Sequence, residues 1–93
     1  MTMRRIAPAP TKRAAIRAVY AAVEAPSWAA ANLDGLADVL RDLSWLPAGP
    51  VTLEWRPSRA LPMAHRRAIE SVLRDAVRGS ANSDHPLIVR GLD

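Results

Sequence analysis

The sequence VTLEW at residues 51–55 restricts the fold most, because it predicts a short strand between two longer amphipathic segments. Its β-branched and aromatic residues are typical of a buried strand, and Pro57 ends it. MRRIA at residues 3–7 predicts a first strand, and PLIVR at residues 86–90 predicts a last one. Parallel neighbours need a connection of about a dozen residues or more, so strands alternating with helices favour a parallel sheet.

Two helices are predicted between the first and second strands. Thr11 is a suitable N-cap for a helix over residues 12–24, which ends before Pro26 because the residue preceding a proline disfavours helical geometry. A second helix covers about residues 32–43, with Asn32 as its N-cap. Its apolar side chains recur at helical spacing and form a stripe that faces a core. These side chains are Leu33, Leu36, Leu40 and Leu43.

A third helix is predicted between the second and third strands. Pro62 suits its first position, and Gly79 suits its C-terminal cap. Its stripe consists of Ile69, Val72, Leu73, Ala76 and Val77. Residues 58–61 could add one short helical turn. We therefore expect a single α/β domain over residues 1–93, with a three-stranded parallel sheet packed by three to four helices in the order β-α-α-β-α-β.

Composition limits the functions to consider. The chain has 93 residues and no cysteine, which excludes disulfides, thiolate metal sites and a cysteine nucleophile. His65 and His85 lack metal-ligand spacing, and no serine lies in a nucleophile motif, so we expect neither an enzyme nor a cofactor, metal or small-molecule ligand. No segment approaches the roughly 20 apolar residues that span a membrane. The N-terminus lacks the apolar run of a signal peptide, so we expect a cytoplasmic protein.

The charges are unevenly distributed, although the net charge is +4. Residues 24–54 carry five acidic side chains and one basic side chain, whereas the flanking segments are basic. Asp34, Asp38 and Asp42 follow one another at four-residue spacing, so they form one column on the second helix. Like charges at this spacing repel by about 0.2–0.5 kcal/mol per pair. The column lies opposite the leucines and is therefore predicted to face outward, towards a positively charged partner.

Simpler interpretations of the same residues remain open at this stage. A column of like charge is commonly only a solvated face of a helix. Trp28 is either a hydrophobic staple or a contact residue, and Leu33 belongs either to the core or to a binding rim. Trp45 can pack beneath the helix end, and Trp55 is expected in the core. Four arginines of the third helix are either solubility charges or the surface of a small nucleic-acid-binding domain. They are Arg66, Arg67, Arg74 and Arg78.

The sequence NLDGLADVL at residues 32–40, followed by VTLEWR at residues 51–56, resembles the barstar family, which inhibits the bacterial ribonuclease barnase inside the cell. The resemblance is close between about Pro26 and Arg56 and weaker outside. It implies three parallel strands with helices packed around them. It also implies one-to-one binding to a microbial extracellular ribonuclease, whose active site is blocked by the second helix and the loop before it.

The resemblance also assigns roles to individual residues. Asp38 would enter the site where the enzyme holds RNA phosphate, and Asp34 and Asn32 would pair with the rim and floor of that site. Trp28 replaces a family tyrosine that packs on the catalytic histidine, and Trp45 takes the place of a second contact aromatic. The implied ribonuclease-binding residues are Trp28, Asn32, Leu33, Asp34, Asp38 and Trp45.

Several positions depart from the family pattern. Ala37 replaces a tryptophan, Ala29 and Ala30 replace an aromatic residue and a glycine, and Arg78 replaces an acidic contact residue. The positive net charge is opposite to that of the acidic family inhibitor. We expect the cognate ribonuclease to be less basic than barnase, because a positive inhibitor is attracted weakly to a strongly positive enzyme. An immunity protein against another toxin is the alternative within the same fold.

Overall fold

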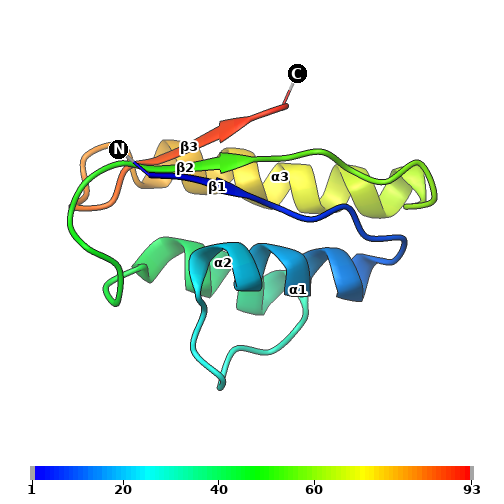
Figure 1. Cartoon of the computed structure of the whole chain (residues 1–93), viewed down its shortest axis with the longest axis horizontal. Coiled ribbons are helices and arrows are strands. Elements are labelled where there is room, and N and C mark those ends of the chain that lie inside the picture. The colour runs from blue at the N-terminus through cyan, green and yellow to red at the C-terminus, as the bar shows by residue number, and fades with distance from the viewer. Residues whose placement is uncertain (1, 93) are drawn as a thin grey trace.

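A computed structural model describes residues 2–92, in which three strands and three helices are present (Figure 1). The strands form one parallel sheet in the order β1-β2-β3, which confirms the predicted fold class and element order. Residues 58–61 form a turn and do not add a fourth helix. The elements in chain order are β1 (Thr2–Arg5), α1 (Lys12–Val23), α2 (Leu33–Asp42), β2 (Val51–Glu54), α3 (Met63–Gly79) and β3 (Leu87–Arg90).

The predicted boundaries of α3 are each wrong by one residue. Pro62 is the N-cap, with an extended ψ of 141°, and the helix begins at Met63. At the other end Gly79 is still helical, and Ser80 is the C-cap. The helix continues because the backbone N–H of Ser80 donates to the carbonyl of Ala76 at 3.0 Å. The Ser80 hydroxyl then accepts from the backbone N–H of Leu87 at 2.8 Å, which joins the end of α3 to the start of β3.

The two faces of the sheet have different surroundings. Successive residues of a strand point to opposite faces, and Val51 and Leu53 of β2 point into the core with 4% and 0% exposure. On the opposite face Met3 and Ile88 are 47% and 43% exposed. Both are in register with Thr52, which lies between them on the central strand and is 1% exposed. The helices therefore cover one face of the sheet. Among the described residues, the buried Thr52 hydroxyl has no hydrogen-bond partner.

The core lies between that covered face and the three helices. Each helix contributes a stripe of buried side chains, as the sequence periodicity predicts. In α2 the stripe is completed by Val39, and Leu33 at the first turn is only partly buried. Figure 1 shows α1 and α2 on the side away from the strands, with the loop of residues 24–32 projecting from that side. The fully buried helical side chains include Ile16, Val19, Val23, Leu36, Leu40, Leu43, Ile69 and Leu73.

One carboxylate is buried at the edge of this core. Glu70 of α3 accepts hydrogen bonds from the Trp55 indole N–H at 2.8 Å and from Nε of Arg66 at 2.9 Å. Trp55 is 3% exposed, which confirms it as a core residue. Arg66 was expected to face solvent as a solubility charge; its side chain is 36% exposed, and it is also held by this ion pair. Burial acts to raise the pKa of Glu70, but the two hydrogen bonds and the charges of Arg66 and Arg74 outweigh it and lower the pKa.

Candidate interface on helix α2

Helix α2 is held firmly at its start and along its inner side. Asn32 has an extended backbone, and its side-chain oxygen accepts the backbone N–H of Gly35 at 2.7 Å, which confirms the predicted N-cap. Leu36 and Leu40 are 0% and 1% exposed. Asp34 lies in the first turn, where the helix dipole favours negative charge. The outer side of α2 is therefore presented on a rigid support.

The outer side of α2 carries an aspartate ridge, defined as Asp34, Asp38 and Asp42. All three are exposed, which confirms the outward orientation that the four-residue spacing predicts. Within residues 2–92 none of them forms an ion pair, although the chain holds 13 lysines and arginines. Four other acids do pair with arginines. These pairs are Glu24 with Arg4, Glu54 with Arg5 and Arg56, Glu70 with Arg66, and Asp75 with Arg78.

The loop of residues 24–32 is fixed against the first turn of α2. The Tyr20 hydroxyl of α1 donates to the carbonyl of Ala30 at 2.6 Å. The same carbonyl oxygen would lie 2.2 Å from a Cβ added to Gly35, and the Tyr20 hydroxyl would lie 2.9 Å from it. Glycine at position 35 thus allows the loop backbone to approach the helix closely. The loop position is determined jointly by α1 and α2.

The hydrogen bond from the Tyr20 hydroxyl to the Ala30 carbonyl, the Tyr20 anchor, lies close enough to the ridge for the charge of an aspartate to act on it. The pKa of Tyr20 is raised, first by burial of the phenol and second by the negative charge of Asp38. Asp38 is therefore close enough to Tyr20 for its charge to act on the phenol.

Trp28 lies in this loop and is 66% exposed. The backbone N–H of Ala29 donates to the carbonyl of Pro26 at 3.1 Å, so a tight turn carries the indole. The structure does not support the alternative of Trp28 as a buried hydrophobic staple. A large aromatic side chain on a projecting loop is well placed for contact with a partner.

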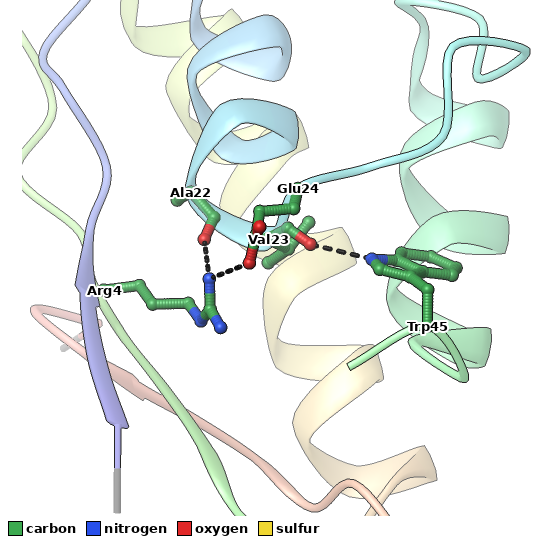
Figure 2. Close-up of polar contacts among 5 residues, drawn as sticks. All are labelled: Arg4, Ala22, Val23, Glu24 and Trp45. Atoms are coloured by element: carbon green, nitrogen blue, oxygen red, sulfur yellow. Dashed lines mark hydrogen bonds and ion pairs between the residues drawn. The ribbon is translucent and has the colours of Figure 1, made fainter. Parts of the chain in front are cut away.

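Trp45, a predicted ribonuclease-binding residue, forms a hydrogen bond within the chain. Its indole N–H donates to the carbonyl of Val23 at 2.8 Å, and the ring is partly buried against the core. Arg4 of β1 donates to the neighbouring carbonyl of Ala22 at 3.1 Å and pairs with Glu24 at 2.8 Å, as Figure 2 shows. Carbonyls at a helix C-terminus lack partners within the helix. Trp45 and Arg4 satisfy two of them and thereby join the end of α1 to the segment that follows α2 and to β1.

The sequence interpretation did not identify Tyr20 or Gly35 as parts of this interface. Tyr20 follows the apolar spacing of α1, so its ring suggests packing and its hydroxyl adds no pattern. A glycine inside an amphipathic helix is a recognised sign of close packing or function, and Gly35 could have been noticed on that basis. Its partner, the carbonyl of Ala30, is a backbone atom that no side-chain motif reveals.

The search for a metal site and for a membrane span covers the part of the chain that the structure describes. Residues 2–92 contain no group of three or more metal-ligating side chains. The same residues contain no helix that is long and apolar enough to cross a membrane. What the interface offers chemically is negative charge on a rigid helix next to an exposed indole.

Comparison with known protein families identifies one to which most of the chain is similar. The family described as Barstar (barnase inhibitor) matches residues 4–90. The chain belongs to the barstar family. The matched range includes the aspartate ridge, the loop with Trp28 and the Tyr20 anchor. No curated protein and no solved structure matched the chain in the corresponding comparisons. The barstar family is one of inhibitors and not of enzymes.

Proposed function

We propose that this barstar-family protein inhibits a microbial guanyl-specific ribonuclease by placing the aspartate ridge in the enzyme's active site. The observation that carries the proposal is the ridge itself, which is exposed and without ion pairs within residues 2–92. An enzyme that cleaves RNA must surround a phosphate with cationic donors. A carboxylate on a rigid helix can occupy that position and offers no bond to cleave. Inhibition then follows from occlusion of the site.

Four residues of the interface have a defined task in this mechanism. Asp38, at the centre of the ridge, takes the place of the RNA phosphate. Asp34 pairs with a cation at the rim, and the Asn32 amide nitrogen, which the helix cap does not use, donates to the floor. Trp28 covers the catalytic residues from the loop side. Because the helix and loop are already ordered, binding loses little conformational entropy.

The biological consequence of the proposal is protection of the cell's own RNA. The protein acts in the cytoplasm as a one-to-one partner of a ribonuclease that is secreted or delivered as a toxin. An immunity protein against a toxin nuclease of another class would use the same ridge. That alternative differs from the proposal only in which enzyme is captured.

A nucleic-acid-binding domain is the main alternative from another class of protein, because the net charge is +4. Its cations would come from α3, where Arg66 is already paired with Glu70 and Arg78 with Asp75. Arg67 is exposed and is the suitable position for a test of this alternative. If the chain bound nucleic acid, Arg67→Ala would weaken binding and Asp38→Ala would not.

The experiment is an RNA-cleavage assay with a panel of guanyl-specific microbial ribonucleases. The wild-type protein, Asp38→Ala and Arg67→Ala are each titrated against every enzyme. We expect stoichiometric inhibition of at least one enzyme by wild type and by Arg67→Ala, and its loss in Asp38→Ala. Inhibition by Asp38→Ala equal to that of wild type would contradict the mechanism. If no guanyl-specific enzyme is inhibited, the same variants are titrated against toxin nucleases of other classes, and capture of one of these would support the immunity alternative.

A further inference from the structure

A hollow lies between α2 and α3 directly beside the aspartate ridge. Its volume is about 200 Å³, and it is lined by Ala37 and Arg41 of α2 and by Val72, Ala76 and Gly79 of α3, together with polar residues at the rim. Ala37, Val72 and Ala76 are partly buried, so apolar surface remains open to solvent at the bottom of the hollow. Nothing in the packing of the described residues fills this space.

The hollow and the ridge are continuous along α2. Ala37 directly precedes Asp38, and Arg41 directly precedes Asp42. Ala37 and Arg41 are themselves one helical turn apart, so they line the same flank of α2. A protein that covers the central aspartate therefore also covers the hollow. A single partner must match both features at once.

The size and chemistry of the hollow indicate what fits it. Its volume of about 200 Å³ exceeds the roughly 150 Å³ of an apolar protein cavity that admits benzene. The alanine and valine side chains present an apolar floor suited to an aromatic ring. Aromatic side chains that enter a pocket near the centre of an interface commonly dominate its binding energy.

The charges at the rim of the hollow indicate a second feature of the partner, besides an aromatic side chain. Asp75 lies at the hollow but is paired with Arg78 of the same helix, so its charge is compensated within the chain. The guanidinium of Arg41 forms no ion pair with any of residues 2–92. A partner that covers this rim gains most by placing a carboxylate opposite Arg41.

We infer that the hollow receives an aromatic side chain of the inhibited ribonuclease, beside an acidic residue of that enzyme that pairs with Arg41. The inference rests on the proposed function and extends it from the enzyme's active site to the surface next to it. The cognate enzyme thus has a cationic cleft bordered on one side by an aromatic and an acidic residue. This arrangement would distinguish it from ribonucleases whose cleft is surrounded by positive charge alone.

The inference is tested by substitutions that place larger side chains in the hollow. Ala76→Leu places a larger side chain on its α3 wall, and Ala37→Leu does so from α2. Ala64→Leu is the matched control, because Ala64 is an exposed alanine of α3 that does not line the hollow. Inhibition of the enzyme captured by wild type is measured for each variant, together with thermal unfolding to confirm that each folds.

We expect both filling variants to weaken inhibition about tenfold or more, because overpacking excludes the partner's side chain. Ala64→Leu is expected to inhibit like wild type. Wild-type inhibition by both folded filling variants, with the Asp38→Ala loss still present, would overturn this inference and leave the proposed function intact. Failure of wild type to inhibit any enzyme of the panel would overturn the proposed function and this inference together.

A second readout needs no enzyme. Indole is added to the free protein, and the methyl resonances of Ala37, Val72 and Ala76 are followed by NMR. We expect concentration-dependent shifts at these methyls in wild type, and the loss of the shifts at Ala37 and Val72 in Ala76→Leu. The absence of shifts at these positions in wild type would overturn the assignment of the hollow to an aromatic ring.

Discussion

Glu70 and the aspartate ridge differ in burial and in their bonding partners. Glu70 on α3 is 8% exposed, accepts hydrogen bonds from Trp55 and Arg66, and has a lowered pKa. The aspartate ridge on α2 is exposed, and none of its members forms an ion pair within residues 2–92. Both sets lie on amphipathic helices of the same small fold. Of these two sets, Glu70 is bonded within the chain's own core, whereas the three aspartates of the ridge face solvent.

We therefore expect changes in the two regions to affect different quantities. A change at Glu70 should lower stability and leave the affinity of the folded protein for its enzyme unaltered. A change on the ridge should lower affinity with little effect on stability. Exposed, unpaired surface residues usually contribute within about 0.5 kcal/mol of folding free energy.

The largest effect is expected for Asp38→Ala. Truncation of one member of a buried charge pair in an interface costs about 2–5 kcal/mol of binding free energy, a range to which barnase and barstar themselves contribute. Calorimetric titration against the inhibited ribonuclease measures this loss. Thermal unfolding of the free variant is expected to match wild type. A large drop in stability with unchanged affinity would reverse the proposed assignment of the two regions.

Glu70→Ala is expected to act in the opposite way. It removes the acceptor of the Trp55 indole N–H, and a buried donor without a partner costs about 1–3 kcal/mol. Urea unfolding followed by tryptophan fluorescence gives the change in unfolding free energy. Glu54→Ala serves as a milder control, because it removes a carboxylate of β2 that pairs with the exposed side chains of Arg5 and Arg56. A Glu70→Ala protein as stable as wild type would show that this buried pair is dispensable.

The pH dependence of stability should follow Glu70. Because its pKa is lower in the folded protein than its ordinary value of 4.5, the unfolded chain binds more protons between those two pKa values. The stabilisation is complete above pH 4.5 and is lost as the pH falls through the lower, folded pKa. Unfolding free energies measured across this acidic range should decline more steeply for wild type than for Glu70→Gln. Equal slopes would assign the acid sensitivity to other groups.

A smaller effect is expected at the anchor between the two interface segments. Tyr20→Phe removes the hydrogen bond to the carbonyl of Ala30. A typical hydrogen bond contributes about 0.5–1.5 kcal/mol to the free energy of folding. If Tyr20 acts by holding the loop that carries Trp28, its effect on affinity should disappear in a Trp28→Ala background. A double-mutant cycle by calorimetry measures this coupling. Additive losses would show that the hydroxyl does not act through Trp28.

The smallest effect is expected on the uncovered face of the sheet. Thr52 is 1% exposed, and its hydroxyl has no hydrogen-bond partner among the described residues. Thr52→Val keeps the shape and removes the unpaired polar group, so stability should rise by up to about 1 kcal/mol. Urea unfolding tests this, with ribonuclease affinity unchanged. A loss of stability would show that the hydroxyl finds a partner in solution.

The sequence predicted the features that depend on local periodicity. The leucines and aspartates of α2 lie on opposite sides because helical spacing alone determines those directions. The Asn32 cap was predictable for the same reason, since its bond to Gly35 spans only three residues. The parallel sheet followed from the lengths of the connections between strands.

The features that were missed depend on contacts distant in the sequence. Glu70 has the spacing of an ordinary helical residue, and its hydrogen-bond donor Trp55 lies fifteen residues earlier, directly after β2. The anchor joins a tyrosine of α1 to a loop carbonyl, which carries no side-chain signature. The hollow beside Ala37 depends on how closely α2 approaches α3, a distance that no single helix encodes.

Competition with a nucleotide tests the central claim most directly. The affinity of the wild-type protein for the inhibited ribonuclease is measured while guanosine 3′-phosphate, a ligand of guanyl-specific active sites, is increased. If the ridge occupies the position of the RNA phosphate, the apparent affinity should fall in proportion to nucleotide occupancy. An affinity that stays constant when the nucleotide saturates the enzyme would contradict the account, because both ligands would then bind at once.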